Sequence, residues 1–439
     1  MEKHHHHERS TFSGKLGFVL SAAGASVGLG NIWRFPYLAA KYGGGIFLLI
    51  YIILALTFGY SMIIAETALG RMTRKSPVGA FGKFGKSKWL SFGGWVIKYL
   101  IEYVKGNSQK LAEDGYFSAF ISDGTSTEIC FLVFALLTLA IIFAGVRNGV
   151  ERVSKFMMPI LVFLSVLIAF YSVTRPGALA GVKYFLVPNP ANFSWMTVVA
   201  AMGQMFYSLS IAMGILVTFG SYMKRDVSIE GSTTNVEIFD TAIAIMAGLM
   251  IIPAVFSFSG GDPDTLQAGP ALMFITIPKV FANMGFGTPI GIIFFLLVLM
   301  AALTSSIALT ESAVSTFQDE LRWPRKGATV IVGIIMVILG SLSSLGYGPL
   351  AFVKIIGMQF LDFFDFLTNS VMMPIAAFAT CILISRVIGV GKIEEEVEAD
   401  GGSFKRKKVF RFMIRYLCPI FAVIILLSSV ANAFGWISM

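Results

Sequence analysis

The sequence predicts an all-α protein that crosses a membrane about eleven times. Of its 439 residues 56% are hydrophobic and only 13% are charged, whereas soluble domains carry about 25% charged residues. Apolar runs of about 20 residues, the length that spans a bilayer core as a helix, recur along the whole chain. Lysine and arginine collect in short loops, where they set orientation, so the net charge of +9 does not indicate binding to nucleic acid.

Eleven apolar segments account for most of the chain. They cover residues 14–39, 44–70, 89–104, 128–146, 156–173, 193–222, 238–258, 286–318, 327–346, 355–387 and 412–437. The loops after the even-numbered segments are the basic ones, which predicts a cytoplasmic N-terminus and an external C-terminus. The third segment is short and contains Lys98 and Glu102, so it is either a tilted or interfacial span or one that has lost residues.

The segments outside these spans predict no catalytic or metal site. We expect residues 1–13 to form a cytoplasmic tail, whose histidine run His4–His7 is typical of a tag rather than a metal site. The cytoplasmic loop 389–411 is expected to be solvated, with contact between Lys405–Lys408 and anionic lipid as the alternative. The three cysteines are expected to pack as small core residues.

The first segment is interrupted in a way that predicts a binding site. Its stretch SAAGASVGLGNIWRFP, residues 21–36, contains three glycines within seven residues and then Asn31 and Arg34. Each glycine costs a helix interior about 1 kcal/mol relative to alanine, and arginine is rare at membrane depth. Lipid tolerates an opened helix only where the freed backbone groups line a cavity. We therefore expect a broken helix whose backbone binds a ligand.

The sixth segment carries a second interruption, at Gly203, Gln204, Ser208, Ser210 and Gly214. Broken helices in corresponding positions of two halves indicate the inverted repeats of a secondary transporter, with a site at the interface of the repeats. The alternative is that these small residues only allow close packing between helices.

Six motifs give the chain a family resemblance. GLGNIWRFP (28–36), KYGGG (41–45), ETALGR (66–71), GVERVSKFMMP (149–159), GQMFYSLS (203–210) and AALTSS (301–306) resemble the neurotransmitter:sodium symporter family, especially its bacterial amino-acid transporters. The resemblance implies a five-plus-five inverted repeat, helices 1–5 over residues 14–184 and helices 6–10 over 185–388, followed by helix 11 over 412–439. It implies sodium-coupled symport of amino acids across the bacterial inner membrane and no enzymatic reaction.

The resemblance also implies how an amino-acid zwitterion binds. Its carboxylate would meet backbone amides near Leu29 and Gly30, at the positive end of a half-helix. Its ammonium would meet the carbonyls near Ala25 and of Tyr207 and the hydroxyl of Ser210. The implied side-chain pocket consists of Ala25, Ser26, Val27, Tyr207, Met213, Ser305 and Leu309. Because Met213 is adaptable, we expect a bulky apolar or aromatic amino acid, tyrosine included.

Two sodium sites are implied in the same way. The ligands of the first are Ser26, Asn31, Ser208 and Asp240. The ligands of the second are Gly24, Val27, Ala301, Thr304 and Ser305. Read without the resemblance, Thr304–Ser306 would simply bond to the preceding helical turn.

One residue of the first sodium site leads to a hypothesis about chloride. Asp240 stands where relatives commonly have asparagine, and it adds a negative charge that chloride supplies in chloride-dependent relatives. We expect chloride not to be required. Tyr51 and Gln204 match the positions that line the chloride site of those relatives. The alternative is that Asp240 only caps the seventh helix.

Two gates are expected to close the access paths. Arg34 and Asp365 would close the outer path over Tyr207, with Asp362 as the alternative acid. The cytoplasmic path would be latched by Arg9 and Asp319, with help from Phe12 and Tyr222. Glu66, in the second segment, is expected to be a buried structural acid that supports the helix breaks.

The third segment departs from the family pattern. Relatives have a longer third helix with a tyrosine that holds the substrate carboxylate, whereas here Trp89–Phe92 leads directly into Gly93. One rival hypothesis is a ligand-binding sensor or channel-like protein on the same scaffold. Another is a chain that binds sodium or substrate poorly because the tyrosine is absent. A membrane enzyme is not expected because no histidine follows the tail, and the oligomeric state is left open.

Overall fold

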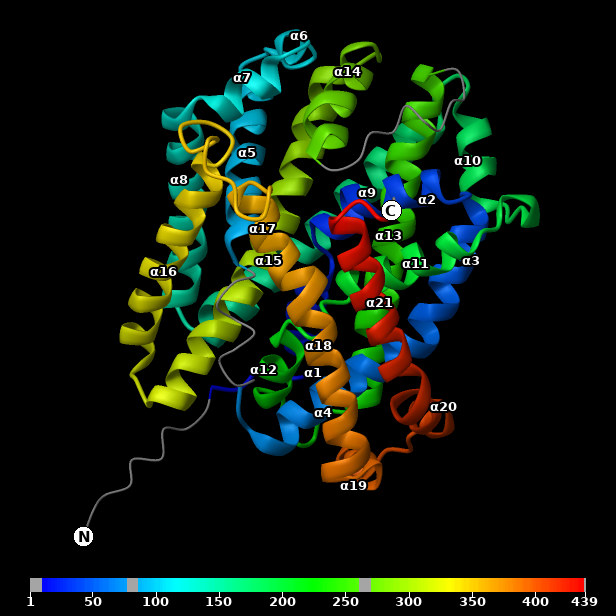
Figure 1. Ribbon diagram of the computed structural model, residues 1–439, viewed down its shortest axis with the longest axis vertical. Helices are drawn as coiled ribbons and strands as arrows, with labels where there is room; N and C mark the ends of the chain where they lie inside the picture. The colour runs from blue at the N-terminus through cyan, green and yellow to red at the C-terminus, as the bar shows by residue number, and fades with distance from the viewer. Residues whose placement is uncertain (1–9, 77–85, 260–269, 438–439) are drawn as a thin grey trace.

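The computed structural model describes residues 10–76, 86–259 and 270–437, which form a bundle of helices (Figure 1). Within these residues, eight helices are long and apolar enough to cross a membrane, and a ninth span is a pair of helices bent by 51°. The other two predicted segments are the 19-residue helix α5 and the interrupted sixth segment. The predicted fold class, a polytopic all-α membrane protein, is confirmed.

The first half of the chain supplies helices 1–5. Helix 1 comprises α1 (Lys15–Ser26), η1 (Gly30–Arg34) and α2 (Phe35–Lys41), and helix 2 comprises α3 (Gly45–Leu54), η2 (Ala55–Gly59) and α4 (Tyr60–Thr73). Helix 3 is α5 (Lys86–Val104), helix 4 is α8 (Gly124–Phe143), and helix 5 is η3 (Val146–Glu151) with α9 (Arg152–Val173). The short α6 (Ser108–Leu111) and α7 (Tyr116–Ser122) connect helices 3 and 4.

The second half supplies helices 6–11. Helix 6 is α11 (Trp195–Ser208) with α12 (Ile215–Ser221), helix 7 is α13 (Ile229–Ser259), helix 8 is α15 (Gly287–Leu321) and helix 9 is α16 (Arg325–Leu345). Helix 10 comprises α17 (Phe360–Asp365), η7 (Phe366–Met372), α18 (Met373–Ile382) and η8 (Leu383–Ile388). Helix 11 comprises α20 (Lys407–Phe412), η10 (Met413–Leu417) and α21 (Cys418–Ala433). The connections contain α10 (Ala178–Leu186), η4 (Pro190–Asn192), η6 (Leu272–Thr276), α14 (Ile277–Ala282), α19 (Val390–Val397) and η9 (Glu398–Asp400).

The two ends of the bundle are easily told apart in Figure 1. The short helices α6, α10 and α14 lie at the upper end, and α19 and α20 lie at the lower end. We refer to these as the α14 end and the α19 end.

Helices 5 and 7 begin about three turns earlier than their apolar segments predicted. Helix 5 starts at Val146, not residue 156, and helix 7 starts at Ile229, not residue 238. Charged residues in these first turns lower the local hydropathy, so hydropathy alone does not reveal where the two helices start. In helix 5 the carboxylate of Glu151 accepts the backbone N–H of Ser13 at 2.9 Å and pairs with Lys155 at 2.6 Å, so this charge is satisfied locally.

The segment 389–411 is not the solvated loop expected from its charges. Ile393, Val397, Phe404 and Phe410 are buried, and α19 packs against α4. The guanidinium of Arg71, on α4, is fully buried and pairs with Glu396 at 2.6 Å. Apolar side chains dock this segment. In its acidic run Glu394 and Glu396 have basic partners, whereas Glu395 is exposed.

Helix 3 packs mainly against helices 4, 8 and 9. A side chain at Gly94 would lie 2.7 Å from the backbone nitrogen of Phe131, so glycine lets α5 and α8 touch through their backbones. At about 1.5 Å per residue, 19 residues rise about 28 Å, just under the hydrocarbon thickness. The interpretation of the third segment as a short span is therefore consistent with the structure.

Candidate functional site

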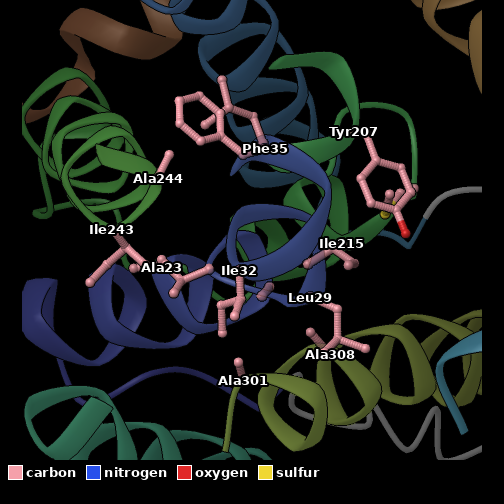
Figure 2. Close-up of a cluster of buried hydrophobic side chains, with 14 of the residues drawn as sticks. Ala23, Leu29, Ile32, Phe35, Tyr207, Ile215, Ile243, Ala244, Ala301 and Ala308 are labelled. Atoms are coloured by element: carbon pink, nitrogen blue, oxygen red, sulfur yellow. The ribbon is translucent and has the colours of Figure 1, made fainter. Parts of the chain in front are cut away.

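The predicted break in helix 1 is present. The α-helix ends at Ser26, and residues 27–29 separate it from η1. The carbonyl of Ala25 points to helices 6 and 8, where it accepts hydrogen bonds from the hydroxyls of Ser210 and Ser305, each at 3.3 Å. Figure 2 shows Leu29 and Ile32 of this region among Ala301 and Ala308 of α15 and Ile215 of α12. The break thus lies inside the core, between helices 6 and 8.

The break in helix 6 is held open by a buried acid. Residues 209–214 separate α11 from α12, and Ser210 and Ala212 have positive φ values of 54° and 61°. Such values are uncommon for residues other than glycine and need outside support. The buried carboxylate of Glu66 supplies it by accepting the backbone N–H of Ala212 at 2.7 Å. The prediction that Glu66 supports a helix break is borne out.

Three of the four residues expected to bind the first sodium ion lie together. Asn31 Nδ2 donates to Asp240 Oδ1 at 2.8 Å. The Ser208 hydroxyl oxygen is 2.9 Å from both Asn31 Oδ1 and Asp240 Oδ1. Tyr51 donates to Asp240 Oδ2 at 3.0 Å, and all four side chains are buried. Ser26 is also buried, but its carbonyl accepts the backbone N–H of Gly28 at 2.8 Å.

This cluster has the composition of a site for a hard cation. It brings amide, hydroxyl and carboxylate oxygens together with one negative charge, the ligands that hard cations prefer. A buried carboxylate is costly without a counter-charge, and here only neutral hydrogen bonds surround it in the described part of the chain. Asp240 therefore does more than cap helix 7, because its side chain joins helices 1, 2, 6 and 7.

Residues expected at the second sodium site also come close to one another. A Cβ built on Gly24 would lie 3.4 Å from Cβ of Thr304, which places α1 against α15. Thr304 donates to the carbonyls of Met300 and Ala301, at 3.1 Å each. That is the bonding to the preceding turn that was expected without the resemblance. Val27 is fully buried nearby on the chain, beside the break.

The ring of Tyr207 lies directly over the break in helix 1. A Cβ added to Gly30 would be 2.8 Å from two ring carbons of Tyr207, so only glycine permits this approach. On the other side, the guanidinium carbon of Arg34 lies 5.0 Å from the ring centre, within cation–π range. Gln204, one turn before Tyr207, donates to the carbonyl of Gly30 at 2.9 Å.

Above this ring is a cavity of about 250 Å³ that contains both residues of the predicted outer gate. Arg34, Tyr207 and Asp365 all line it, together with residues of α18 and α21. Asp365 accepts a hydrogen bond from Asn369, and Asp362 accepts one from Tyr347 at 2.9 Å. Because Asp365 and not Asp362 lines the cavity, the structure favours Asp365 as the acid that faces Arg34.

The opposite side of the break is covered by an aromatic cluster. Phe12 is 1% exposed and packs edge-on against Phe18, Phe219 and Tyr222. Its backbone N–H donates to the carbonyl of Tyr222 at 3.1 Å. The expected contribution of Phe12 and Tyr222 to a latch is thus supported. Arg9 lies outside the described residues, and Asp319 accepts hydrogen bonds from the N–H and hydroxyl of Ser76, at 2.7 and 2.6 Å.

Sequence reasoning missed a buried ion pair near this aromatic cluster. Glu311 of α15 is fully buried and binds both terminal nitrogens of Arg325, at 2.8 and 2.6 Å, and the hydroxyl of Tyr222 at 2.7 Å. The signal was present, because a carboxylate inside the apolar segment 286–318 is expensive and is normally paired. Glu311 links helices 6, 8 and 9 at this side of the site.

The remaining pocket residues are buried around the two breaks. Met213 is 9% exposed, and Leu309 is half-buried against the same hydrophobic core. Two helices broken inside the core, a buried carboxylate among oxygen-bearing side chains, and aromatic covers on either side define a membrane transporter with a site at its centre.

Comparison with known proteins identifies the class more closely. A profile of the sodium:neurotransmitter symporter family matches residues 9–105 and 96–435. The chain is 33% identical to the sodium-dependent transporter YhdH of Bacillus subtilis, over 95% of this chain and 97% of that protein. It is 26% identical to the sodium- and chloride-dependent GABA transporter 2 of mouse, over 89% of this chain and 75% of that protein.

A solved structure is similar as well. The crystal structure of MhsT in complex with L-phenylalanine superimposes with a TM-score of 0.84, at 33% identity, covering 96% of this chain and all of that one. The chain belongs to the sodium:neurotransmitter symporter family, and it is a sodium-dependent transporter, not an enzyme. The two family matches overlap at residues 96–105, in the last turns of α5 and the residue that follows it.

Proposed function

We propose that this protein is a sodium-coupled symporter of bulky apolar or aromatic amino acids that works by alternating access. The observation that carries the proposal is the convergence of Asn31, Ser208 and Asp240 at the two helix breaks, under the ring of Tyr207. The similarity to a structure solved with L-phenylalanine supports an amino acid with a large apolar side chain.

In this proposal the helix breaks replace charged side chains as the groups that bind the zwitterion. The N–H groups of Leu29 and Gly30 at the start of η1 receive the carboxylate. The Ala25 carbonyl, already bonded to the hydroxyls of Ser210 and Ser305, receives the ammonium. Val27, Met213 and Leu309 contact the side chain.

In this proposal sodium and amino-acid transport are coupled because the ion and the substrate share one binding site. A sodium ion among Asn31, Ser208 and Asp240 would touch the substrate carboxylate, so each favours binding of the other by the same free energy. Thr304 and Ser305 would turn their hydroxyl oxygens to a second ion between helices 1 and 8. Each sodium ion moved inward gains about 2.3 kcal/mol per 100 mV of membrane potential.

In this proposal the α19 end faces the cytoplasm, as the positive-inside rule predicts for the side that carries the basic loops. The cavity lined by Arg34 and Asp365 then faces outside, and the cluster around Phe12 closes the cytoplasmic path. Asp240 supplies a fixed negative charge in the ion cluster, which supports chloride-independent transport.

The decisive experiment is uptake of radiolabelled L-phenylalanine and L-tyrosine into proteoliposomes under an inward sodium gradient. We expect accumulation that disappears when potassium replaces sodium. Equal uptake in the two salts would refute sodium coupling, and retention of uptake after gluconate replaces chloride is expected for a chloride-independent carrier.

A second candidate follows from the short helix 3. Without the third-helix tyrosine of the family pattern, the chain could bind ligand as a sensor and not carry it. Sodium-dependent binding of phenylalanine to the purified protein, with no accumulation in proteoliposomes, would favour this candidate.

A further inference from the structure

A second cavity lies at the α19 end, away from the transport site. It measures about 790 Å³ and is lined entirely by residues 404–416. These residues comprise the end of segment 389–411, called the docked segment below, and the first turns of helix 11. Six of its lining residues are lysine or arginine, and its remaining lining residues are aromatic or valine. A surface cavity of this composition favours a ligand that is anionic at one end and apolar at the other.

Half of the positive charge in this cavity is already neutralised. Arg406 pairs with Glu237 at 2.9 Å, Lys407 with Glu398 at 3.2 Å, and Arg411 with Glu394 at 2.7 Å. The first pair ties this part of the chain to helix 7, and the other two lie within residues 394–411.

The other three cations are uncommitted. Lys405, Lys408 and Arg415 are exposed, and among the residues with described positions no carboxylate pairs with their charged side-chain groups within 4 Å. The backbone N–H of Lys405 donates to the carboxylate of Glu230 at 2.9 Å. Lys408 and Arg415 are seven residues apart on the continuous helix formed by α20 and η10, and both line the cavity. An anion bound between these two side chains would neutralise positive charge of the cavity that no carboxylate already pairs with.

This face continues into the apolar surface of helix 11. Phe412, Tyr416, Ile420, Val423 and Leu427 follow at spacings of three or four residues, and each is between 39% and 64% exposed. Such a stripe on a membrane-spanning helix faces lipid chains. The rings of Phe412 and Tyr416 lie 5.7 Å apart, near the start of the apolar helix 407–433. Aromatic residues are enriched where membrane spans meet the headgroups.

We propose that this cavity binds the phosphate headgroup of an anionic phospholipid, with the acyl chains along the exposed stripe of helix 11. Lys408 and Arg415 hold the phosphate, and Lys405 adds to the local positive potential. An anionic lipid matches both the charge and the apolar continuation, whereas free phosphate would use only the first. The bound lipid would hold the docked segment and helix 11 together.

The test measures thermal stability of the purified, detergent-solubilised protein with added dioleoyl phosphatidylglycerol, dioleoyl phosphatidylcholine or inorganic phosphate. We expect only phosphatidylglycerol to raise the unfolding temperature. The double variant Lys408→Gln/Arg415→Gln should need about 30-fold more of that lipid, because each basic residue near an anionic headgroup contributes about 1 kcal/mol.

The matched control is Arg147→Gln/Lys326→Gln, which removes the same charge from exposed residues elsewhere in the basic loops. It should leave the phosphatidylglycerol response unchanged. If both double variants lose the response to phosphatidylglycerol equally, the lipid is held only by diffuse electrostatic attraction to the basic loops. That result would overturn the proposal. A response to phosphate equal to that to the lipid, or no response to the lipid, would overturn it as well. Native mass spectrometry should count bound phosphatidylglycerol in the parent protein and not in the first double variant.

Discussion

Replacing Gly30 by alanine tests the contact between the two broken helices most directly. The added Cβ would lie 2.8 Å from Cδ1 and Cε1 of Tyr207. Carbon atoms prefer separations of about 3.5–4.0 Å, so the ring or the helix must move by about 1 Å. Overpacking of this size costs about 1–3 kcal/mol, and here the cost falls on the arrangement in which Tyr207 covers the site.

The expected result is weaker substrate binding and slower uptake, by about 5- to 150-fold for that free-energy range. Gly203→Ala is the matched control, because a Cβ at Gly203 on the same helix as Tyr207 meets nothing within 4 Å. Phenylalanine binding by scintillation proximity and sodium-driven uptake measure the effect, with unfolding temperature as a check on folding.

A double-mutant cycle separates the clash from other effects of the added methyl group. In a Tyr207→Ala background the ring is gone, so Gly30→Ala should cost little more. If Gly30→Ala binds and transports like the parent protein, or if Gly203→Ala is equally impaired, the proposed packing of Tyr207 on the helix break is wrong.

The other predictions concern the ion sites, the support that Glu66 gives to the break in helix 6, and the pH dependence of stability. Asp240→Asn should lower uptake at limiting sodium by more than about tenfold and make it respond to chloride; uptake unaffected by either ion would contradict the role of this charge. Thr304→Val keeps the side-chain volume and should raise the sodium concentration needed for half-maximal uptake without changing the unfolding temperature. Glu66→Ala leaves the buried N–H of Ala212 unsatisfied and should destabilise the fold by about 1–3 kcal/mol, seen in thermal unfolding, whereas Glu66→Gln should cost less. Burial alone would raise the pKa of Glu394, but the arginine and lysine that bind it hold this pKa below its ordinary value. Its stabilisation is therefore complete above the ordinary carboxyl pKa and is lost as the pH falls through the lower folded-state pKa, so Glu394→Gln should flatten the acid dependence of thermal stability.

Most of the fold could be predicted from local properties of the chain. Apolar length located the spans, and the glycines of residues 24–30 located the break in helix 1. In helix 6, Ser210 and Gly214 lie in the break at residues 209–214, whereas Gly203 and Gln204 lie inside the unbroken α11, contrary to the expectation. The starts of helices 5 and 7 could not be found in this way, because residues such as Glu151 make those turns polar while their partners lie elsewhere in the chain.

The docked segment shows the same limit. Its acidic run reads as a solvated loop until Arg71, 325 residues earlier in the chain, is seen to lie beside Glu396. Glu311 was likewise visible as an acid at membrane depth, but its partners Arg325 and Tyr222 come from two other helices.

By itself, the sequence determined that this protein spans a membrane many times and opens two of its helices, because span length and helix weakness depend on neighbouring residues. Tertiary structure decided what those openings face. Asn31 and Asp240 are 209 positions apart, yet they share a hydrogen bond at the centre of the bundle. Tyr207 lies on Gly30 only because helices 1 and 6 cross at their breaks. Hydropathy does not encode such contacts, since they depend on which faces of distant helices pack together.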